Sequence, residues 1–172
     1  MTLFNSIMEI DLFKVSKDEF GAAYDQTLLD QYTIYINTAE KVSEKRQSAN
    51  SLFLTLNAAL LTYIGHENVF AENSDVVTIA ILASLVGFFL CYHWMSLINS
   101  YKSLNKAKFE IIHLIERRLP LSLFESEWNL LKGRSEGKSY KDLTDSEKWI
   151  PRILSFVYFA IFCFAIGRLV SI

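Results

Sequence analysis

The stretch VVTIAILASLVGFFLCYHWMSLINSY, residues Val76 to Tyr101, decides the fold of this chain. It contains 26 residues without a single Asp, Glu, Lys or Arg. About 20 apolar residues in a helix, at about 1.5 Å each, span the roughly 30 Å of hydrocarbon in a bilayer. As a buried core helix it would need to be enclosed completely, and a chain of 172 residues has few left to do so. We therefore predict that this stretch crosses a membrane.

Two further runs lack charged side chains. Residues 47–66 form a run of 20, and residues 153–167 form a run of 15 between Arg152 and Arg168. The last run is the weaker candidate, because it reaches spanning length only if Arg168 snorkels to the interface. Residues 150–172 are therefore predicted to form a third transmembrane helix, an interfacial helix or a helix packed on the other spans. The sequence predicts an all-α integral membrane protein with two or three transmembrane helices.

The charged residues beside these runs are unevenly distributed. Over the whole chain the charges nearly balance, with 17 Lys and Arg against 19 Asp and Glu. Lys and Arg cluster before residue 47 and after residue 101, whereas the connection 66–75 carries only acidic charge. Positively charged flanks remain on the cytoplasmic side. We expect residues 1–46 and 102–149 in the cytoplasm. In this reading, residues 47–101 form a transmembrane hairpin, with residues 66–75 outside.

The flanking segments read as helices that extend the spans. Ser16 and Glu19 have capping-box spacing, and an apolar stripe follows, so residues 16–46 are predicted to be one helix that continues into the first span. The second span should continue as a helix to about Arg118, because Pro120 ends it. Thereafter we predict a short amphipathic helix over residues 121–131, a flexible loop over 132–139 and a last helix that begins at residues 144–147.

Common catalytic patterns are missing from the sequence. Cys91 and Cys163 lie inside apolar runs without a CxxC pairing, and the three histidines are scattered. Phosphate-binding glycine loops, serine nucleophile elbows and HExxH pairs do not occur. We therefore expect no catalytic, cofactor or metal site, no enzymatic activity and no direct binding of nucleic acid.

Small and polar residues recur along the runs, and helices in lipid associate through such residues. Asn57 is the most informative, because an amide near the middle of a membrane needs a partner in another helix or in water that lines a cavity. Both alternatives remain open from the sequence. The candidate pore-lining or interhelical residues are Asn50, Thr55, Asn57 and Thr62, and the candidate small packing residues are Ala83, Gly87, Cys91, Ala160 and Gly167.

Several short motifs beside the spans carry a family resemblance over residues 40–155. They are EKVSEKRQSANS at 40–51, Trp94, Ser100-Tyr101, Leu104-Asn105, Ala107-Lys108-Phe109, Leu119-Pro120, Glu127-Trp128, Leu143-Thr144, Glu147 and Pro151. With these motifs the chain resembles the RipA-like family of small octameric bacterial membrane proteins, which includes the membrane accessory protein of type VI-B CRISPR systems.

The resemblance implies an octameric pore in the inner membrane that permeabilises or depolarises it in antiphage defence, coupled to an RNA-guided RNA nuclease. Other members are tied to envelope stress. Independently of the resemblance, three spans enclose no aqueous path in one subunit, so a conduit requires a ring of identical subunits. The partners expected are membrane lipid and further copies of the chain. A non-conducting scaffold that recruits cytoplasmic partners is the second hypothesis, and a membrane-tethered nuclease or lipid enzyme is the third.

Overall fold

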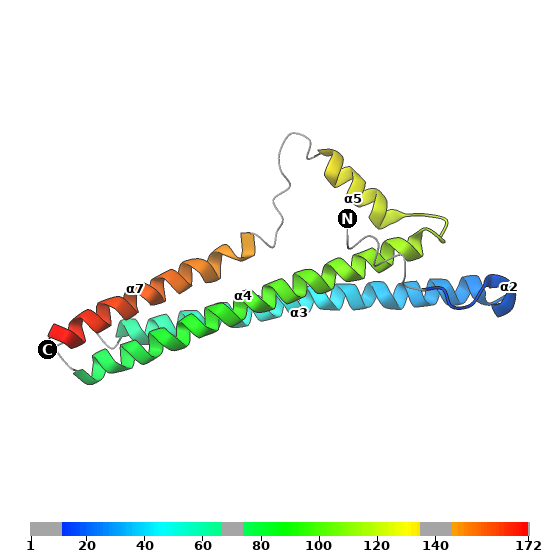
Figure 1. Ribbon diagram of the computed structural model, residues 1–172. Coiled ribbons are helices and arrows are strands. Elements are labelled where there is room, and N and C mark those ends of the chain that lie inside the picture. Colours follow the sequence, from blue (N-terminus) through cyan, green and yellow to red (C-terminus); the bar gives the residue numbers. More distant parts are fainter. Residues whose placement is uncertain (1–11, 67–73, 135–145, 172) are drawn as a thin grey trace. The chain divides into compact units, whose positions relative to one another are not determined.

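The computed structural model describes residues 12–66, 74–134 and 146–171, and their regular structure is helical (Figure 1). The chain divides after Thr38 into two compact units, and α3 contributes residues to both. The predicted connection 66–75, the loop 132–139 and the start of the last helix fall wholly or largely outside the described residues. The helices are α2 (Lys17–Phe20), α3 (Tyr24–His66), α4 (Ser74–Glu116), α5 (Leu123–Arg134) and α7 (Trp149–Ser171).

The first unit begins with a capped turn. The Ser16 hydroxyl accepts a hydrogen bond from the Glu19 backbone N–H at 3.3 Å, as the capping-box spacing predicts. The prediction of one uninterrupted helix from residue 16 is wrong, because Gly21 has a φ of 85° and ends α2. Glycine adopts this left-handed conformation without the steric cost that a Cβ adds. The helix resumes at Tyr24 and then continues to His66, which confirms the predicted continuity into the first uncharged run.

In the second unit, residues 39–66 of α3 pack with α4 and α7 around a common apolar core. Figure 1 shows α7 alongside α4, and side chains of all three helices meet in the interior. One cluster of buried residues consists of Ile64, Val77, Ala80, Cys91, Tyr158 and Ala165, and a second consists of Phe53, Trp94 and Ile98.

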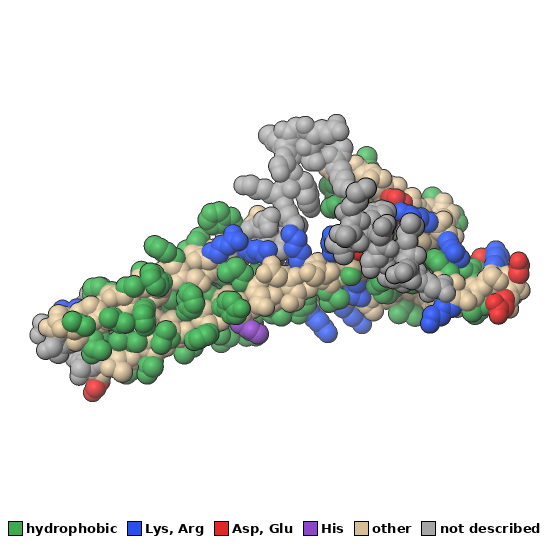
Figure 2. Space-filling model, in the orientation of Figure 1, with side chains coloured by type: hydrophobic (Ala, Val, Ile, Leu, Met, Phe, Trp, Pro, Cys, Tyr) green, Lys and Arg blue, Asp and Glu red, His purple; other side chains and the backbone are tan. Residues whose placement is uncertain are grey.

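Two of these helices, α4 and α7, are long and apolar enough to cross a membrane. In the sequence the run in α7 is the weaker candidate; in the structure α7 is one helix of 23 residues and a candidate span, whereas α3 does not reach the same hydropathy. The Asn, Ser and Thr side chains of residues 47–66 lower the hydropathy of α3. In Figure 2, hydrophobic side chains cover the end of the second unit that contains α7, and Lys and Arg side chains gather beyond it.

A buried carboxylate fixes the corner between α4 and α5. Glu116 is 1% exposed, and its two carboxylate oxygens accept the backbone N–H groups of Phe124 and Glu125 at 3.0 and 3.2 Å. These N–H groups lie in the first turn of α5 and have no partner within that helix. Phe109 packs edge-on against Phe124 at a centroid distance of 5.8 Å. The last turn of α4 thus caps the next helix from eight or nine residues upstream.

We expect Glu116→Ala to loosen the start of α5, because two N–H groups lose their acceptor. Loss of a helix cap costs about 1 kcal/mol, which corresponds to exchange of the protected amides that is faster by about fivefold or more. Hydrogen exchange on the full chain in detergent, followed at residues 124 and 125, measures the effect. Glu127→Ala removes an exposed acid from the same helix and serves as control; equal exchange in both variants would contradict the capping role.

Candidate functional site in the membrane-spanning helices

Asn57 stands at the point where the three packed helices meet. Its side chain is 0% exposed, and its Nδ2 donates to the Phe53 carbonyl oxygen at 2.7 Å. The Cys91 thiol of α4 donates to Asn57 Oδ1 at 3.4 Å. The Tyr158 hydroxyl of α7 donates to the Asn57 backbone oxygen at 3.2 Å. Both neighbouring helices thus direct a polar side chain to one residue of α3, in an otherwise apolar core.

Gly87 provides the space that this arrangement needs. The Tyr158 ring lies directly against the Gly87 Cα, and a Cβ at this position would overlap three ring carbons. Small residues allow helices in lipid to approach closely. The small residues predicted on α4 therefore serve packing inside the subunit: Gly87 and Cys91 are buried and Ala83 is half-buried.

A second set of polar contacts lies near Arg46, where residues of α3 meet α4 and the segment just before α7. Trp94 Nε1 donates to Asn50 Oδ1 at 2.8 Å, and the Trp94 ring stacks on Phe53 with an interplanar angle of 9°. Arg46 Nη2 lies 3.2 Å from Glu147 Oε1. Asn50 and Asn57 are therefore both engaged within the subunit, which favours the interhelical alternative for these two residues.

Thr55 and Thr62 lie on a different face of α3 from Asn57. Thr55 and Thr62 are exposed, and their hydroxyls donate to the carbonyl oxygens of Ser51 and Ala58 at 2.9 and 2.8 Å. Together with Ser51 and Ala58 they recur at spacings of three and four residues, so the four side chains lie on one helix face, away from Asn57. We call Ser51, Thr55, Ala58 and Thr62 the α3 outer stripe; all four are exposed in the isolated subunit.

The small residues of α7 are also on the outside. Ala160, Cys163 and Gly167 are exposed, and a Cβ at Gly167 would meet no atom within 4 Å. The inner face of the same helix carries Tyr158 and Ala165, both 0% exposed. The predicted stripes therefore divide into one used within the subunit, on α4, and two that remain exposed, on α3 and α7.

Sequence reasoning missed Tyr158 and Glu116, and it singled out Glu147 only as a motif residue and not as the partner of Arg46. Tyr158 is a hydroxyl-bearing side chain in an otherwise apolar run, which is a local signal. Glu116 gives no local signal, because it accepts from N–H groups of another helix. Among the described residues, no group of three or more His, Cys, Asp or Glu side chains is placed to hold a metal ion.

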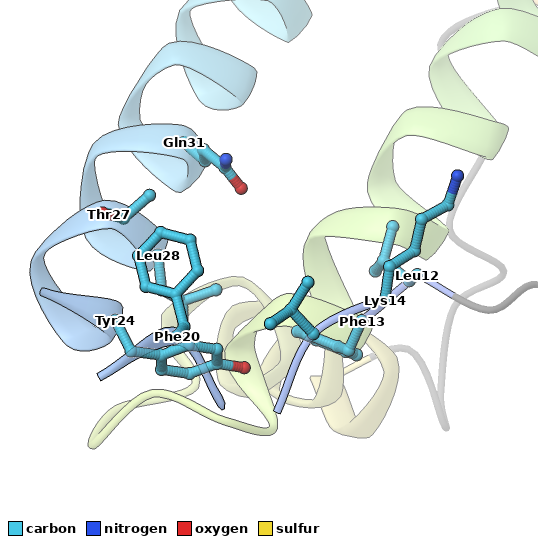
Figure 3. Close-up of a pocket in the computed structure, with 9 residues that line it drawn as sticks. Leu12, Phe13, Lys14, Phe20, Tyr24, Thr27, Leu28 and Gln31 are labelled. Carbon is cyan, nitrogen blue, oxygen red and sulfur yellow. The ribbon is translucent and has the colours of Figure 1, made fainter. Parts of the chain in front are cut away.

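The first unit has a separate apolar groove of about 240 Å³. Figure 3 shows Phe20, Tyr24 and Leu28 facing Leu12 and Phe13 of the segment before α2. Phe20 and Tyr24 pack edge to face at 6.0 Å. Only one of its lining residues is charged, so the groove offers packing surface rather than chemistry.

Comparison with known proteins adds one finding to this geometry. The profile of the octameric membrane protein family (8xMP) matches residues 29–167, about four-fifths of the chain. The chain belongs to the octameric membrane protein family. The match confirms the resemblance to small octameric membrane proteins, and it implies that the chain associates with copies of itself. No curated protein and no solved structure gave a significant match.

Proposed function

We propose that eight copies of this chain form a ring in the inner membrane of a bacterium and let ions pass through its centre. The α3 outer stripe is the observation that carries the proposal. It is a row of small and hydroxyl-bearing side chains, exposed in the isolated subunit, on a helix of a membrane protein. Such a face is better placed against another subunit or water than against lipid chains.

The lower hydropathy of α3 supports a position nearest the ring centre. Of the three packed helices, α4 and α7 are apolar enough to face lipid, and α3 is not. A ring that puts α4 and α7 outside and α3 inside leaves the α3 outer stripe facing the axis. Thr55 and Thr62 already donate their hydroxyl protons to their own helix, so their oxygens are oriented as acceptors. Acceptor oxygens of this kind suit the hydration shell of a cation.

The path has to lie between subunits because the interior of one subunit is closed. Asn57, Tyr158 and Cys91 are each 0% exposed and bond to one another across the core. A ring also needs two different faces that meet head to tail. The exposed small residues of α7 supply one such face, and the α3 outer stripe stays free to face the axis.

Permeabilisation without catalysis fits this chain best. The sequence carries no recognised catalytic motif, and the resemblance to the accessory protein of type VI-B CRISPR systems links such a pore to an RNA-guided RNA nuclease in antiphage defence. In this proposal the Lys- and Arg-rich segments on either side of residues 47–101 lie in the cytoplasm. There they are positioned to receive the signal that opens the ring.

Removing the hydroxyls of the α3 outer stripe should reduce conduction. We expect Thr55→Val with Thr62→Val, which keeps side-chain shape, to lower ion flux by about three- to tenfold, because an apolar constriction dewets. Flux is measured with purified full chain in liposomes under an imposed potential. Thr33→Val is the matched control: Thr33 makes the same bond to the carbonyl four residues earlier, at 2.9 Å, outside the predicted span.

Two outcomes would count against the pore. The first is an ion flux through the unaltered chain that is no greater than the flux through a non-conducting membrane protein. The scaffold hypothesis would then replace the pore. If the double substitution and Thr33→Val change the ion flux equally, the α3 outer stripe does not line the ion path. Subunit counting by mass measurement in detergent accompanies both experiments, so that a failure to assemble is not mistaken for a closed pore.

A further inference from the structure

A groove of about 150 Å³ opens where the Arg46 end of α3 meets α4 and the start of α7. Leu54 of α3, Trp94 of α4 and Ile150 of α7 are its apolar lining residues, and Gln47, Asn50, Ser51 and Glu147 are its polar ones. We call the Glu147 side chain and Arg46, its ion-pair partner, the rim of the groove. At about 30 Å³ per water, this volume corresponds to about five waters and suits a headgroup-sized ligand rather than a whole lipid.

The position of the groove matches the boundary of a bilayer. Gln47 is the first residue of an uncharged run and follows directly on Arg46. Leu54 lies seven residues further along the helix, about 10 Å deeper. Trp94 has the amphipathic ring that is enriched at membrane interfaces. The groove therefore runs from headgroup level to the start of the hydrocarbon.

The charges at its rim are incompletely paired. Arg46 Nη2 and Glu147 Oε1 are 3.2 Å apart, with side chains that are only 20% and 28% exposed. The other carboxylate oxygen, Glu147 Oε2, is buried and has no hydrogen-bond partner among the described residues. A buried acceptor without a donor is costly, and a guanidinium has five N–H donors. Glu147 Oε2 thus lacks a hydrogen-bond donor, and Arg46 has further N–H donors beyond the one that faces Glu147 Oε1.

We propose that this groove binds a phospholipid whose headgroup ends in a primary ammonium, as in phosphatidylethanolamine. The ammonium donates to the carboxylate of Glu147, whose side chain is 28% exposed, and the phosphate accepts from Arg46. The first carbons of the acyl chains lie on Leu54 and Ile150. Phosphatidylcholine has no N–H to donate, and phosphatidylglycerol has no cation, so the rim discriminates against both. The proposal depends on the chain's location in a membrane and not on whether the ring conducts.

Native mass spectrometry of the full-length assembly in detergent tests the proposal, with phosphatidylethanolamine, phosphatidylcholine and phosphatidylglycerol added in equal amounts. We expect retention of phosphatidylethanolamine over phosphatidylcholine by about tenfold, the factor of one charge-assisted hydrogen bond. Glu147→Gln should bring the ratio close to one. Glu127→Gln removes an exposed acid on α5, away from the groove, and should leave the ratio unchanged.

Glu147→Gln also weakens the ion pair with Arg46, so a second variant guards against a failure to fold. Ile150→Trp fills the groove without altering its charges and should reduce retention of all three lipids together. Equal retention of the three lipids by the unaltered chain would overturn the proposal, as would a preference that survives Glu147→Gln. Failure to retain any lipid, because a neighbouring subunit fills the groove, would overturn it as well.

Discussion

Gly87→Ala is expected to detach α7 from the other two helices of the subunit. The added Cβ would occupy the position of the Tyr158 ring, and that ring is completely buried, so it has no open space to move into. Overpacking of this kind costs about 1–3 kcal/mol, and the value here should lie at the upper end because a ring rather than a flexible chain end has to yield. The Tyr158 bond to the Asn57 backbone oxygen would be lost with it.

Thermal unfolding of the purified chain in detergent, together with the fraction that remains assembled, measures this effect. Gly65→Ala is the matched control, because an added Cβ meets no atom within 4 Å at that position. Alanine favours a helix by about 1 kcal/mol over glycine, so the control should be neutral or slightly stabilising. Gly87→Ala combined with Tyr158→Leu should recover part of the loss. A transition for Gly87→Ala that matches the control would mean that the two helices are not in close contact.

The helices of this chain could be predicted from its sequence because their signals are local. Uncharged runs predict helices at α4 and α7, and the absence of Pro and Gly between Ala22 and Ile64 predicts the continuity of α3. Gly21 was the exception: its positive φ interrupts a helix whose apolar stripe continues on both sides. The stripe depends on the spacing of side chains, and the break depends on the backbone of one residue.

The division of the candidate residues between inside and outside could not be predicted from their spacing. Asn57 and Thr55 are both polar residues in one span, yet Asn57 is completely buried and Thr55 is exposed. The difference depends on which face of α3 meets α4 and α7, and this is set by pairs such as Trp94 with Asn50 and Tyr158 with Asn57. These pairs join residues 44 and 101 positions apart, so no local pattern reveals them.

Asn57→Asp should have the largest effect of any isosteric change in the spans. The amide Nδ2 donates to the Phe53 carbonyl oxygen at 2.7 Å, and the substitution puts a second oxygen there, which repels that carbonyl oxygen when the carboxyl is ionised. The new charge also lies in a core without a compensating cation, where a carboxylate costs about 3 kcal/mol at the centre of a spanning helix. We expect loss of the folded assembly, followed as the fraction of octamer in detergent.

Asn57→Leu separates the loss of the amide from the cost of the charge. It keeps the number and branching of the side-chain heavy atoms, removes the acceptor of the Cys91 thiol and leaves the Tyr158 bond to the backbone oxygen in place. Hydrogen bonds between helices in membranes contribute about 0.6 kcal/mol on average, so this variant should assemble with a small loss of stability. Because Asn57 is buried within one subunit, the proposed pore predicts that Asn57→Leu conducts as the unaltered chain does. A changed conductance in an intact assembly would place Asn57 on the ion path, and in the proposed pore the packing of α3, α4 and α7 would then have to open during conduction.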